Sequence, residues 1–303
     1  RANTTRAEPL DPAQRLYRLT GHKWFCSAPM SDGFLTLAYA PEGLSCFLVP
    51  RITPDGNRNA IHLMRLKDKL GNKSNASAEI EYHGATGWLI GEAGRGVPTI
   101  IDMVHHTRLG TISGTLGIMR MALVQAIHHC RYRKAFGTRL VEQPLMQHVL
   151  ADMALESEAA MAYAMRVARA FESDDERQQL LARIATPVGK YLICKAAPPL
   201  VNEAQECLGG AGYVEESILP RLFRQSPLNS IWEGSGNVQC LDMLRAMAKS
   251  PAALDALNEE LVEAQGAHPA YDRHCSDLKK MLGAVADQPT QARRVAEAVA
   301  RAL

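Results

Sequence analysis

One carboxylate of the chain lies between a tryptophan and a glycine, at Glu233 in residues 231–237 (IWEGSGN). Burial beside Trp232 would strengthen this carboxylate as a proton acceptor, and Gly234 would let a ligand approach the backbone closely. These are the properties of a general base. Ser235 could cap the following helix, whose amino end favours an electron-rich group nearby. The alternative makes Glu233 a first-turn helix residue that complements the helix dipole, and spacing alone favours this alternative.

Basic and aromatic side chains alternate in residues 131–137 (RYRKAFG). Arg133 could hold a phosphate while Phe136 packs against a ring, although basic residues at the carboxyl end of a helix are also usual. A third segment, residues 203–213, contains Gly209 and Gly210. Its glycines predict a helix cap first, and only second a surface where the backbone meets a cofactor.

Residues 24–27 (WFCS) end a predicted strand. Phe25 could cover one face of a planar ring and Ser27 could hydrogen-bond its edge, with a core role as the alternative. The sequence has neither a GxGxxG fingerprint nor a P-loop, so a nucleotide cofactor would need another architecture. No metal site is expected, because neighbouring histidines on a helix point apart and the seven cysteines form no CxxC pair.

Strand patterns precede helical patterns along the chain. Short apolar or alternating runs between glycine-rich turns predict a middle antiparallel β domain, barrel-like, with strands at 16–20, 34–40, 44–49, 62–66 and 78–82. After Gly96 the apolar residues recur at helical spacing, and further helices are predicted to begin at Pro144, after residue 177 and near Ser235. The fold class is therefore α+β, a β domain followed by a mostly antiparallel helical bundle.

The predicted domains are residues 1–95 (β domain), 96–250 (four-helix bundle) and 251–303 (a weakly patterned helical extension). In the first long helix Gly110, Gly114 and Gly117 predict either the close approach of another backbone or a local break. Prolines at 187, 198 and 199 predict bends in the third helix.

The charge is nearly balanced, with 34 Lys and Arg against 32 Asp and Glu, which predicts no strong attraction to nucleic acid or membrane. No apolar run approaches the roughly 20 residues that span a bilayer. Seven scattered cysteines predict reduced thiols in a cytoplasmic protein. The first residues, RANTT, contain neither an initiator methionine nor an apolar signal core. We therefore expect this sequence to begin within a longer protein.

In their order, these segments resemble the acyl-CoA dehydrogenase family. The resemblance covers roughly residues 15–250 and rests on GHKWFCS, LKDKLGNKSNASAEIE, RYRKAFG, LGGAGY and IWEGSGNVQ. It is closest to the AidB-type branch, which is associated with the bacterial alkylation response. It implies an amino-terminal helical domain that is absent here, the two domains predicted above, non-covalent FAD, and a homotetramer built as a dimer of dimers.

The resemblance also assigns site residues. Glu233 falls on the catalytic base, and the implied cofactor-binding positions are Phe25, Cys26, Ser27, Arg133, Phe136, Gly209, Gly210, Trp232, Ser235 and Asn237. Among these, Arg133, Phe136 and the glycine pair would reach the FAD of a neighbouring subunit. Glu206 departs from the pattern, because many relatives have glutamine there and an acid near a pyrophosphate is unfavourable.

The implied reaction is α,β-dehydrogenation of an acyl-CoA. Glu233 would remove the proton α to the thioester carbonyl while a hydride leaves the β carbon for the flavin, giving a trans-2-enoyl product, with an electron-accepting flavoprotein as a further partner. A second hypothesis is a flavoprotein that binds duplex DNA and protects it from alkylation with little turnover, and Arg245 resembles a position linked to that role. A third is a scaffold without a competent cofactor site.

Overall fold

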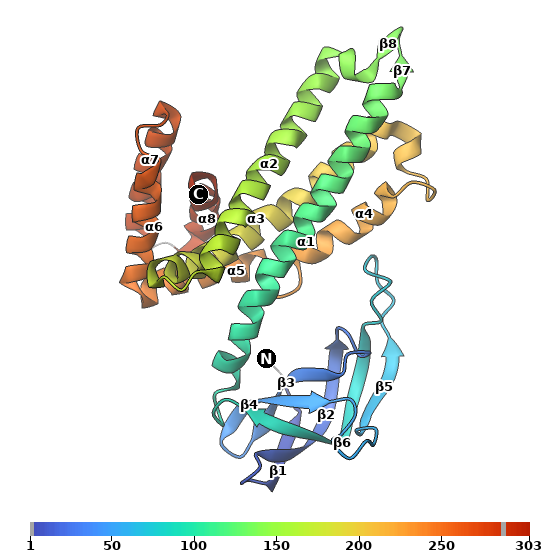
Figure 1. Ribbon diagram of the computed structural model, residues 1–303, viewed down its shortest axis with the longest axis vertical. Coiled ribbons are helices and arrows are strands. Elements are labelled where there is room, and N and C mark those ends of the chain that lie inside the picture. Colours follow the sequence, from blue (N-terminus) through green and yellow to red (C-terminus); the bar gives the residue numbers. More distant parts are fainter. Residues whose placement is uncertain (1–2, 286–288) are drawn as a thin grey trace. The chain divides into compact units, whose positions relative to one another are not determined.

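The chain divides into two compact units, residues 1–106 and residues 107–303. The structure is a computed structural model that describes residues 3–285 and 289–303 (Figure 1). Each unit has a hydrophobic core of its own. None of the described helices combines the length and the apolar character needed to cross a bilayer.

Six strands build the first unit: β1 (Arg6–Asp11), β2 (Leu16–Cys26), β3 (Gly33–Ala40), β4 (Gly43–Pro50), β5 (Ile61–Leu66) and β6 (Ala78–Ile90). The order is β2-β1-β3-β4-β6-β5, and an additional pairing of β2 with β6 closes β2, β1, β3, β4 and β6 into a ring. The predicted β domain is therefore confirmed. It differs from the prediction in that β1 was not among the predicted strands and pairs with β3 in parallel, and in that β2 and β6 are longer than predicted.

Buried and exposed side chains alternate along the strands, and the buried ones form the core of this unit. Tyr17 and Leu19 of β2 are buried, whereas the residues that follow each of them are exposed. Strand β2 runs past its predicted end because Gly21 lies within the strand and forms no turn. An added Cβ at Gly21 would come within 2.7 Å of the Cα of Thr5, so this glycine permits a close backbone contact.

Helices dominate the second unit. Helix α1 (Gly96–Tyr132) begins in the first unit and continues into the second, and a hairpin of β7 (Lys134–Ala135) and β8 (Thr138–Arg139) follows it. The remaining helices are α2 (Pro144–Glu172), α3 (Glu176–Leu208), α4 (Leu219–Gln225), α5 (Gly236–Lys249), α6 (Pro251–Glu263), α7 (Pro269–Val285) and α8 (Ala292–Ala302). Short 3₁₀ turns lie at η1 (Leu140–Glu142), η2 (Gly209–Gly212), η3 (Ser226–Ser230) and η4 (Pro289–Gln291).

Within the described chain, the glycines of α1 neither break the helix nor meet another backbone. The helix is unbroken at Gly110, Gly114 and Gly117, and an added Cβ at each would meet no atom of this chain within 4 Å. All three lie on an exposed face of the helix. Helix α3 likewise continues through Pro187, Pro198 and Pro199 as one helix of 33 residues.

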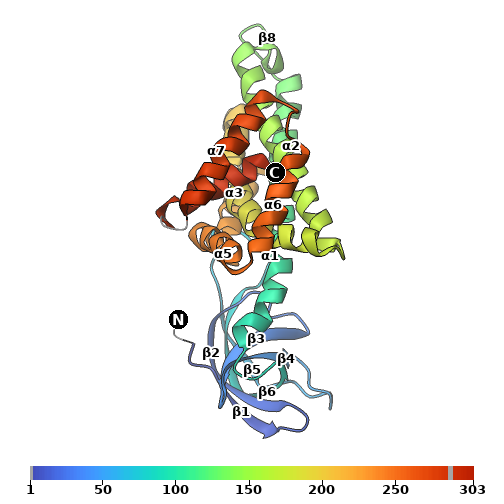
Figure 2. The same cartoon turned by 90° about the vertical axis from the view of Figure 1, so that its left-hand side faces the viewer.

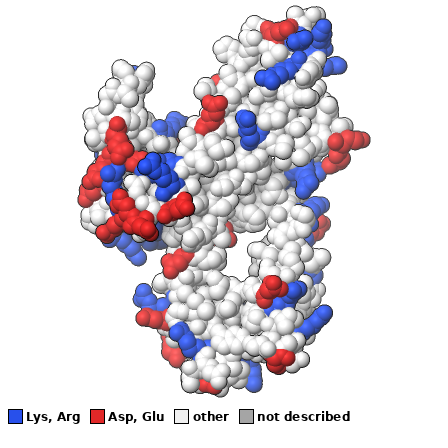
Figure 3. All heavy atoms as spheres, in the orientation of Figure 1, with Lys and Arg blue, Asp and Glu red and all other residues white. Residues whose placement is uncertain are grey.

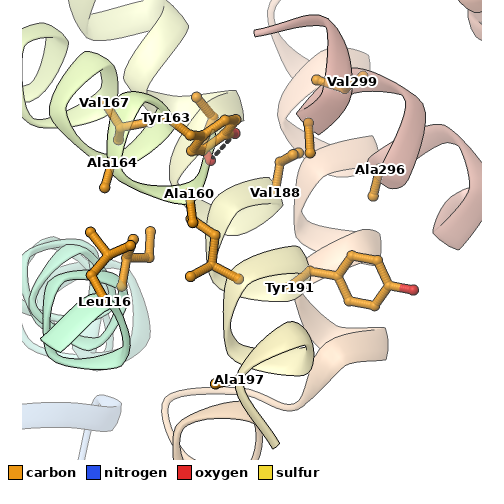
Figure 4. Packing of buried hydrophobic residues seen from close by; sticks show 14 of the residues in the cluster. Leu116, Ala160, Tyr163, Ala164, Val167, Val188, Tyr191, Ala197, Ala296 and Val299 are labelled. Carbon is orange, nitrogen blue, oxygen red and sulfur yellow. Dashed lines mark hydrogen bonds between the residues drawn. The ribbon is translucent and has the colours of Figure 1, made fainter. Parts of the chain in front are cut away.

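Helix α3 is the centre of the helical core. It packs against α2, α5, α6 and α8, and Figure 4 shows Tyr163 of α2, Val188 of α3 and Val299 of α8 in one cluster with Leu116 of α1. The hydroxyl of Tyr163 donates a hydrogen bond to the carbonyl of Ala185, 2.8 Å away. Helices α6 to α8 therefore share the core of the bundle, although alanine makes the apolar pattern of residues 251–303 weak. Figure 2 shows α6 and α7 among the other helices of this unit.

Candidate active site

Glu233 lies in the turn between η3 and α5, and its side chain is half-buried. Its backbone has φ +56°, a left-handed conformation that is uncommon outside glycine, and Gly234 follows with φ +97°. Within residues 3–285 and 289–303, no group donates a hydrogen bond to the Glu233 carboxylate. The carboxylate is therefore free to accept a proton from a bound molecule.

Lys190 of α3 holds this turn from inside the bundle. Its side chain is fully buried, and Nζ donates to the carbonyls of Asn229 (3.1 Å), Trp232 (2.7 Å) and Gly234 (2.9 Å). Desolvation by burial lowers the pKa of Lys190 to about 8. The indole nitrogen of Trp232 is buried and has no hydrogen-bond partner in the described chain.

Arg108 of α1 connects the turn to a buried carboxylate on α5. Its Nε donates to the carbonyl of Glu233 (3.2 Å) and its Nη1 donates to Asp242 (2.6 Å). Asp242 also accepts from Arg183 (2.9 Å) and lies 3.6 Å from Nη1 of Arg245. Burial alone would raise the pKa of Asp242, but the hydrogen bonds and charges of Arg183 and Arg108 outweigh it and hold the pKa below its ordinary value.

Ser235 and Asn237 expose polar side chains at the start of α5. Ser235 occupies the predicted N-cap position, and its side chain makes no capping hydrogen bond. Asn237 accepts a hydrogen bond from Nε of Arg293 on α8, at 2.8 Å. The first N–H groups of α5 and the Ser235 hydroxyl are thus available to an electron-rich ligand.

In the β unit, Phe25, Cys26 and Ser27 line a hollow of about 260 Å³. Phe25 is 52% exposed and lies edge-on to Trp24, with ring centroids 5.1 Å apart. The ammonium of Lys67 lies over both rings, at 4.8 Å from Phe25 and 4.0 Å from Trp24. Cys26 is buried, and burial raises the pKa of its thiol, so it stays neutral.

The hairpin after α1 presents Arg133 and Phe136 at one end of the helical unit. Phe136 is 96% exposed with φ +54°, and Gly137 follows with φ +84°. Figure 3 shows basic side chains gathered at this end, where Arg131, Arg133, Lys134 and Arg139 are all exposed. An aromatic ring so fully exposed has no role in the core of this chain.

Gly209 and Gly210 end α3. Gly209 has φ +62° at the C-cap, as the glycines predicted, and an added Cβ at either residue would meet nothing within 4 Å. Glu206, one turn earlier, is exposed and accepts a hydrogen bond from Asn202 (2.9 Å). The backbone here is therefore open to a ligand from outside the chain.

No sequence motif pointed to the polar residues around the Glu233 turn, which are Lys190, Arg108, Gln239 and Asp242. Lys190 had a signal, because it is a lone charge in the otherwise apolar stretch of residues 184–194. Charged residues are seldom fully buried without a partner, so such a position indicates a specific polar contact.

No group of three or more His, Cys, Asp or Glu residues in the described ranges is arranged to hold a metal ion.

Comparisons with known proteins all indicate one family. The family model "Acyl-CoA dehydrogenase, C-terminal domain" matches residues 94–248. The putative acyl-CoA dehydrogenase AidB of Escherichia coli is 50% identical, over 95% of this chain and 53% of its own length. Acyl-CoA dehydrogenase family member 11 of Caenorhabditis elegans is 34% identical, over 94% of this chain and 50% of its own length.

Among solved structures, Caenorhabditis elegans ACDH-11 in complex with C11-CoA superposes with a TM-score of 0.92 and 32% identity. The match covers 99% of this chain and 56% of that chain. The present chain thus spans about half the length of the relatives that it matches.

Proposed function

This chain belongs to the acyl-CoA dehydrogenase family, and from that premise we propose that it is the catalytic and flavin-binding part of an FAD-dependent enzyme that dehydrogenates an acyl-CoA at the α and β carbons. The observation that carries the proposal is Glu233, a half-buried carboxylate with no hydrogen-bond donor in the described chain, on a turn fixed by buried donors.

The proposed role of Glu233 is that of general base. A carboxylate that already accepted several hydrogen bonds would be a weaker base, and a mobile one would seldom meet the α proton of a thioester. Neither disadvantage applies to Glu233. In the described chain its carboxylate accepts no hydrogen bond, and the bonds from Arg108 and Gln239 to its backbone carbonyl hold the residue in place. It takes the α proton, while the positive end of α5 favours negative charge that develops nearby.

The residues present fit FAD. Phe25 offers an exposed aromatic face beside a hollow, Ser27 an exposed hydroxyl, and Ser235 and Asn237 expose polar groups at a helix amino terminus. We propose that these residues, with Cys26 and Trp232, are the positions of this chain that bind the cofactor. When bound, FAD would supply the acceptor for the hydride that leaves the β carbon.

We also propose a homotetramer, a dimer of dimers, in which Arg133, Phe136, Gly209 and Gly210 contact the FAD of a neighbouring subunit. The 96% exposure of Phe136 and the open backbone at both glycines support this. The neighbour solved with C11-CoA supports an acyl-CoA substrate, and we infer an electron-accepting flavoprotein as the redox partner. The seven cysteines are free and buried, which fits a cytoplasmic protein.

The test is an absorption spectrum of the purified protein before and after acyl-CoA is added. Glu233→Gln is expected to retain yellow flavin and to lose flavin bleaching by acyl-CoA, because the amide cannot accept the proton. Glu158→Gln, which neutralises an exposed carboxylate on α2, is the matched control and is expected to bleach like the parent. Bleaching by Glu233→Gln at the parental rate contradicts the proposal.

The alternative, duplex DNA binding with little turnover, has weaker support. Arg245 is 60% exposed, but it shares the carboxylate of Asp242 with Arg108 and Arg183. A protein that contacts phosphates loses affinity steeply as salt rises. Salt-dependent binding of the protein to a duplex, weakened by Arg245→Gln, would favour this alternative, and no binding at low salt excludes it.

A further inference from the structure

Side chains donate six hydrogen bonds to backbone carbonyls of residues 229–234, in and beside the Glu233 turn. Lys190 contributes three of them, to the carbonyls of Asn229, Trp232 and Gly234. An ammonium group has three N–H donors, so each donor of Lys190 has one carbonyl acceptor. The turn is thus bonded to α3 at residues on both sides of Glu233.

Glu233 itself is held through its own carbonyl. This oxygen accepts from Nε of Arg108 (3.2 Å) and from Nε2 of Gln239 (3.0 Å), and Gln239 also donates to the carbonyl of Gly234 (2.9 Å). Carbonyls fixed on both sides of Glu233 fix its φ of +56°, and with it the direction of the Cα–Cβ bond. The donors therefore set where the carboxylate lies.

Lys190 is a costly residue to bury. It is 1% exposed, and in the part of the chain that the structure describes it forms no ion pair with a carboxylate. Burying a charge without an opposite charge is unfavourable by several kcal/mol, whereas an apolar side chain of similar length would pack against the surrounding helices without that penalty. The position of the turn is what a lysine here provides and an apolar residue does not.

We propose that Lys190 is a positioning residue for proton abstraction: its three hydrogen bonds hold the left-handed backbone of Glu233 and so hold the carboxylate where it meets the α proton. This inference rests on the proposed function of Glu233 as the base. Lys190 acts through the turn, because its hydrogen-bond acceptors are backbone carbonyls of residues 229–234.

The protonation state of Lys190 sets how many of these bonds form. Burial lowers its pKa to about 8, and the charged or titratable groups that act on it are Cys194 of α3, Arg108 of α1 and Glu233 of the turn. The neutral amine has two N–H donors for three carbonyls, so one carbonyl loses its donor. Positioning of Glu233 therefore weakens as the pH rises through about 8.

The experiment measures single-turnover flavin bleaching by acyl-CoA in the FAD-bound protein. Lys190→Met is expected to slow bleaching by about tenfold to a hundredfold, the effect of a misplaced reacting group, with little change in the acyl-CoA concentration that gives half the maximal rate. Tyr163→Phe is the control, because it removes another buried donor to a carbonyl of α3, that of Ala185, which lies outside the Glu233 turn. It is expected to lose stability and to bleach at the parental rate.

A second variant keeps the inference testable if Lys190→Met does not fold. Lys190→Arg retains charge and donors but does not titrate below pH 12, so its bleaching rate is expected to be flat from pH 7 to 9.5, whereas the parental rate falls above about pH 8. A parental rate that is flat over this range, or an unchanged rate in Lys190→Met while Glu233→Gln is inactive, overturns the inference. Unchanged bleaching in Glu233→Gln instead overturns the proposed function.

Discussion

Arg108 on α1 and Asp242 on α5 form a buried ion pair, with Nη1 and Oδ2 2.6 Å apart, although 134 residues separate them in the chain. The same guanidinium donates through Nε to the carbonyl of Glu233. One buried arginine thus ties the turn that carries the candidate base to two helices. The arrangement makes stability and positioning of the site depend on each other.

Removal of the buried carboxylate should therefore destabilise the protein strongly. Asp242→Ala leaves Arg108 and Arg183 without their counter-ion, and we expect the free energy of unfolding to fall by about 3–5 kcal/mol, as for other broken buried ion pairs. Asp242→Asn keeps acceptor capacity and should cost less. Urea unfolding of both variants checks the order, and equal stability of Asp242→Ala and the parent would contradict the role of the pair.

Because the backbone of Glu233 is left-handed, a glycine at this position should make the protein more stable and inactive. A non-glycine residue at φ +56° is strained, so Glu233→Gly is expected to raise the free energy of unfolding by about 1 kcal/mol while it abolishes flavin bleaching. Urea midpoints measured beside those of Glu233→Gln separate the backbone effect from the loss of the carboxylate. A destabilised glycine variant would mean that packing of the Glu233 side chain outweighs the strain.

Lys190 should give the stability of the protein a specific pH dependence. Its pKa is about 8 in the folded protein and 10.5 in the unfolded chain, so between these two pH values the unfolded chain binds more protons. The free energy of unfolding therefore gains a contribution from Lys190 as the pH rises from about 8 to 10.5, by at most about 1.4 kcal/mol per pH unit. This contribution is complete above pH 10.5 and is lost as the pH falls through about 8.

Lys190→Met is the comparison that isolates this effect, since all other titrating groups are shared. The difference in unfolding free energy between parent and variant should change between pH 8 and 10.5 in favour of the parent. The bleaching rate should move in the opposite direction over the same range. Equal pH slopes for the two proteins would show that Lys190 does not titrate in this window.

Two glycines of the helical unit should respond oppositely to alanine. Gly114 lies on an exposed face of α1 with open space around an added Cβ, so Gly114→Ala is expected to stabilise the protein by about 1 kcal/mol through helix propensity. Gly189 on α3 packs against the ring of Tyr163, so Gly189→Ala is expected to destabilise it by about 1–3 kcal/mol. Thermal or urea unfolding measures both.

The outcome at Gly114 also bears on assembly. Should Gly114→Ala destabilise the protein or change its oligomeric state, another backbone approaches this face of α1 in the assembled protein. Size-exclusion chromatography with light scattering separates that result from a local effect.

The order of the elements could be predicted from the sequence alone. Alternation and glycine turns indicated the β domain, helical spacing after Gly96 indicated the bundle, and the resemblance of residues 231–237 to a family motif made Glu233 the candidate base. These features are local, because each depends on a period of a few residues or on one short motif. They can therefore be read without knowledge of the contacts between elements.

Only the tertiary structure decided how the candidate base is held. Lys190, Arg108 and Gln239 come from three helices, and their carbonyl acceptors lie in a turn that has no periodicity of its own. The strand β1 and its parallel pairing with β3 were equally invisible, as was the burial of Asp242 between two arginines. Contacts over such separations depend on the packing of whole elements, which spacing within one segment does not encode.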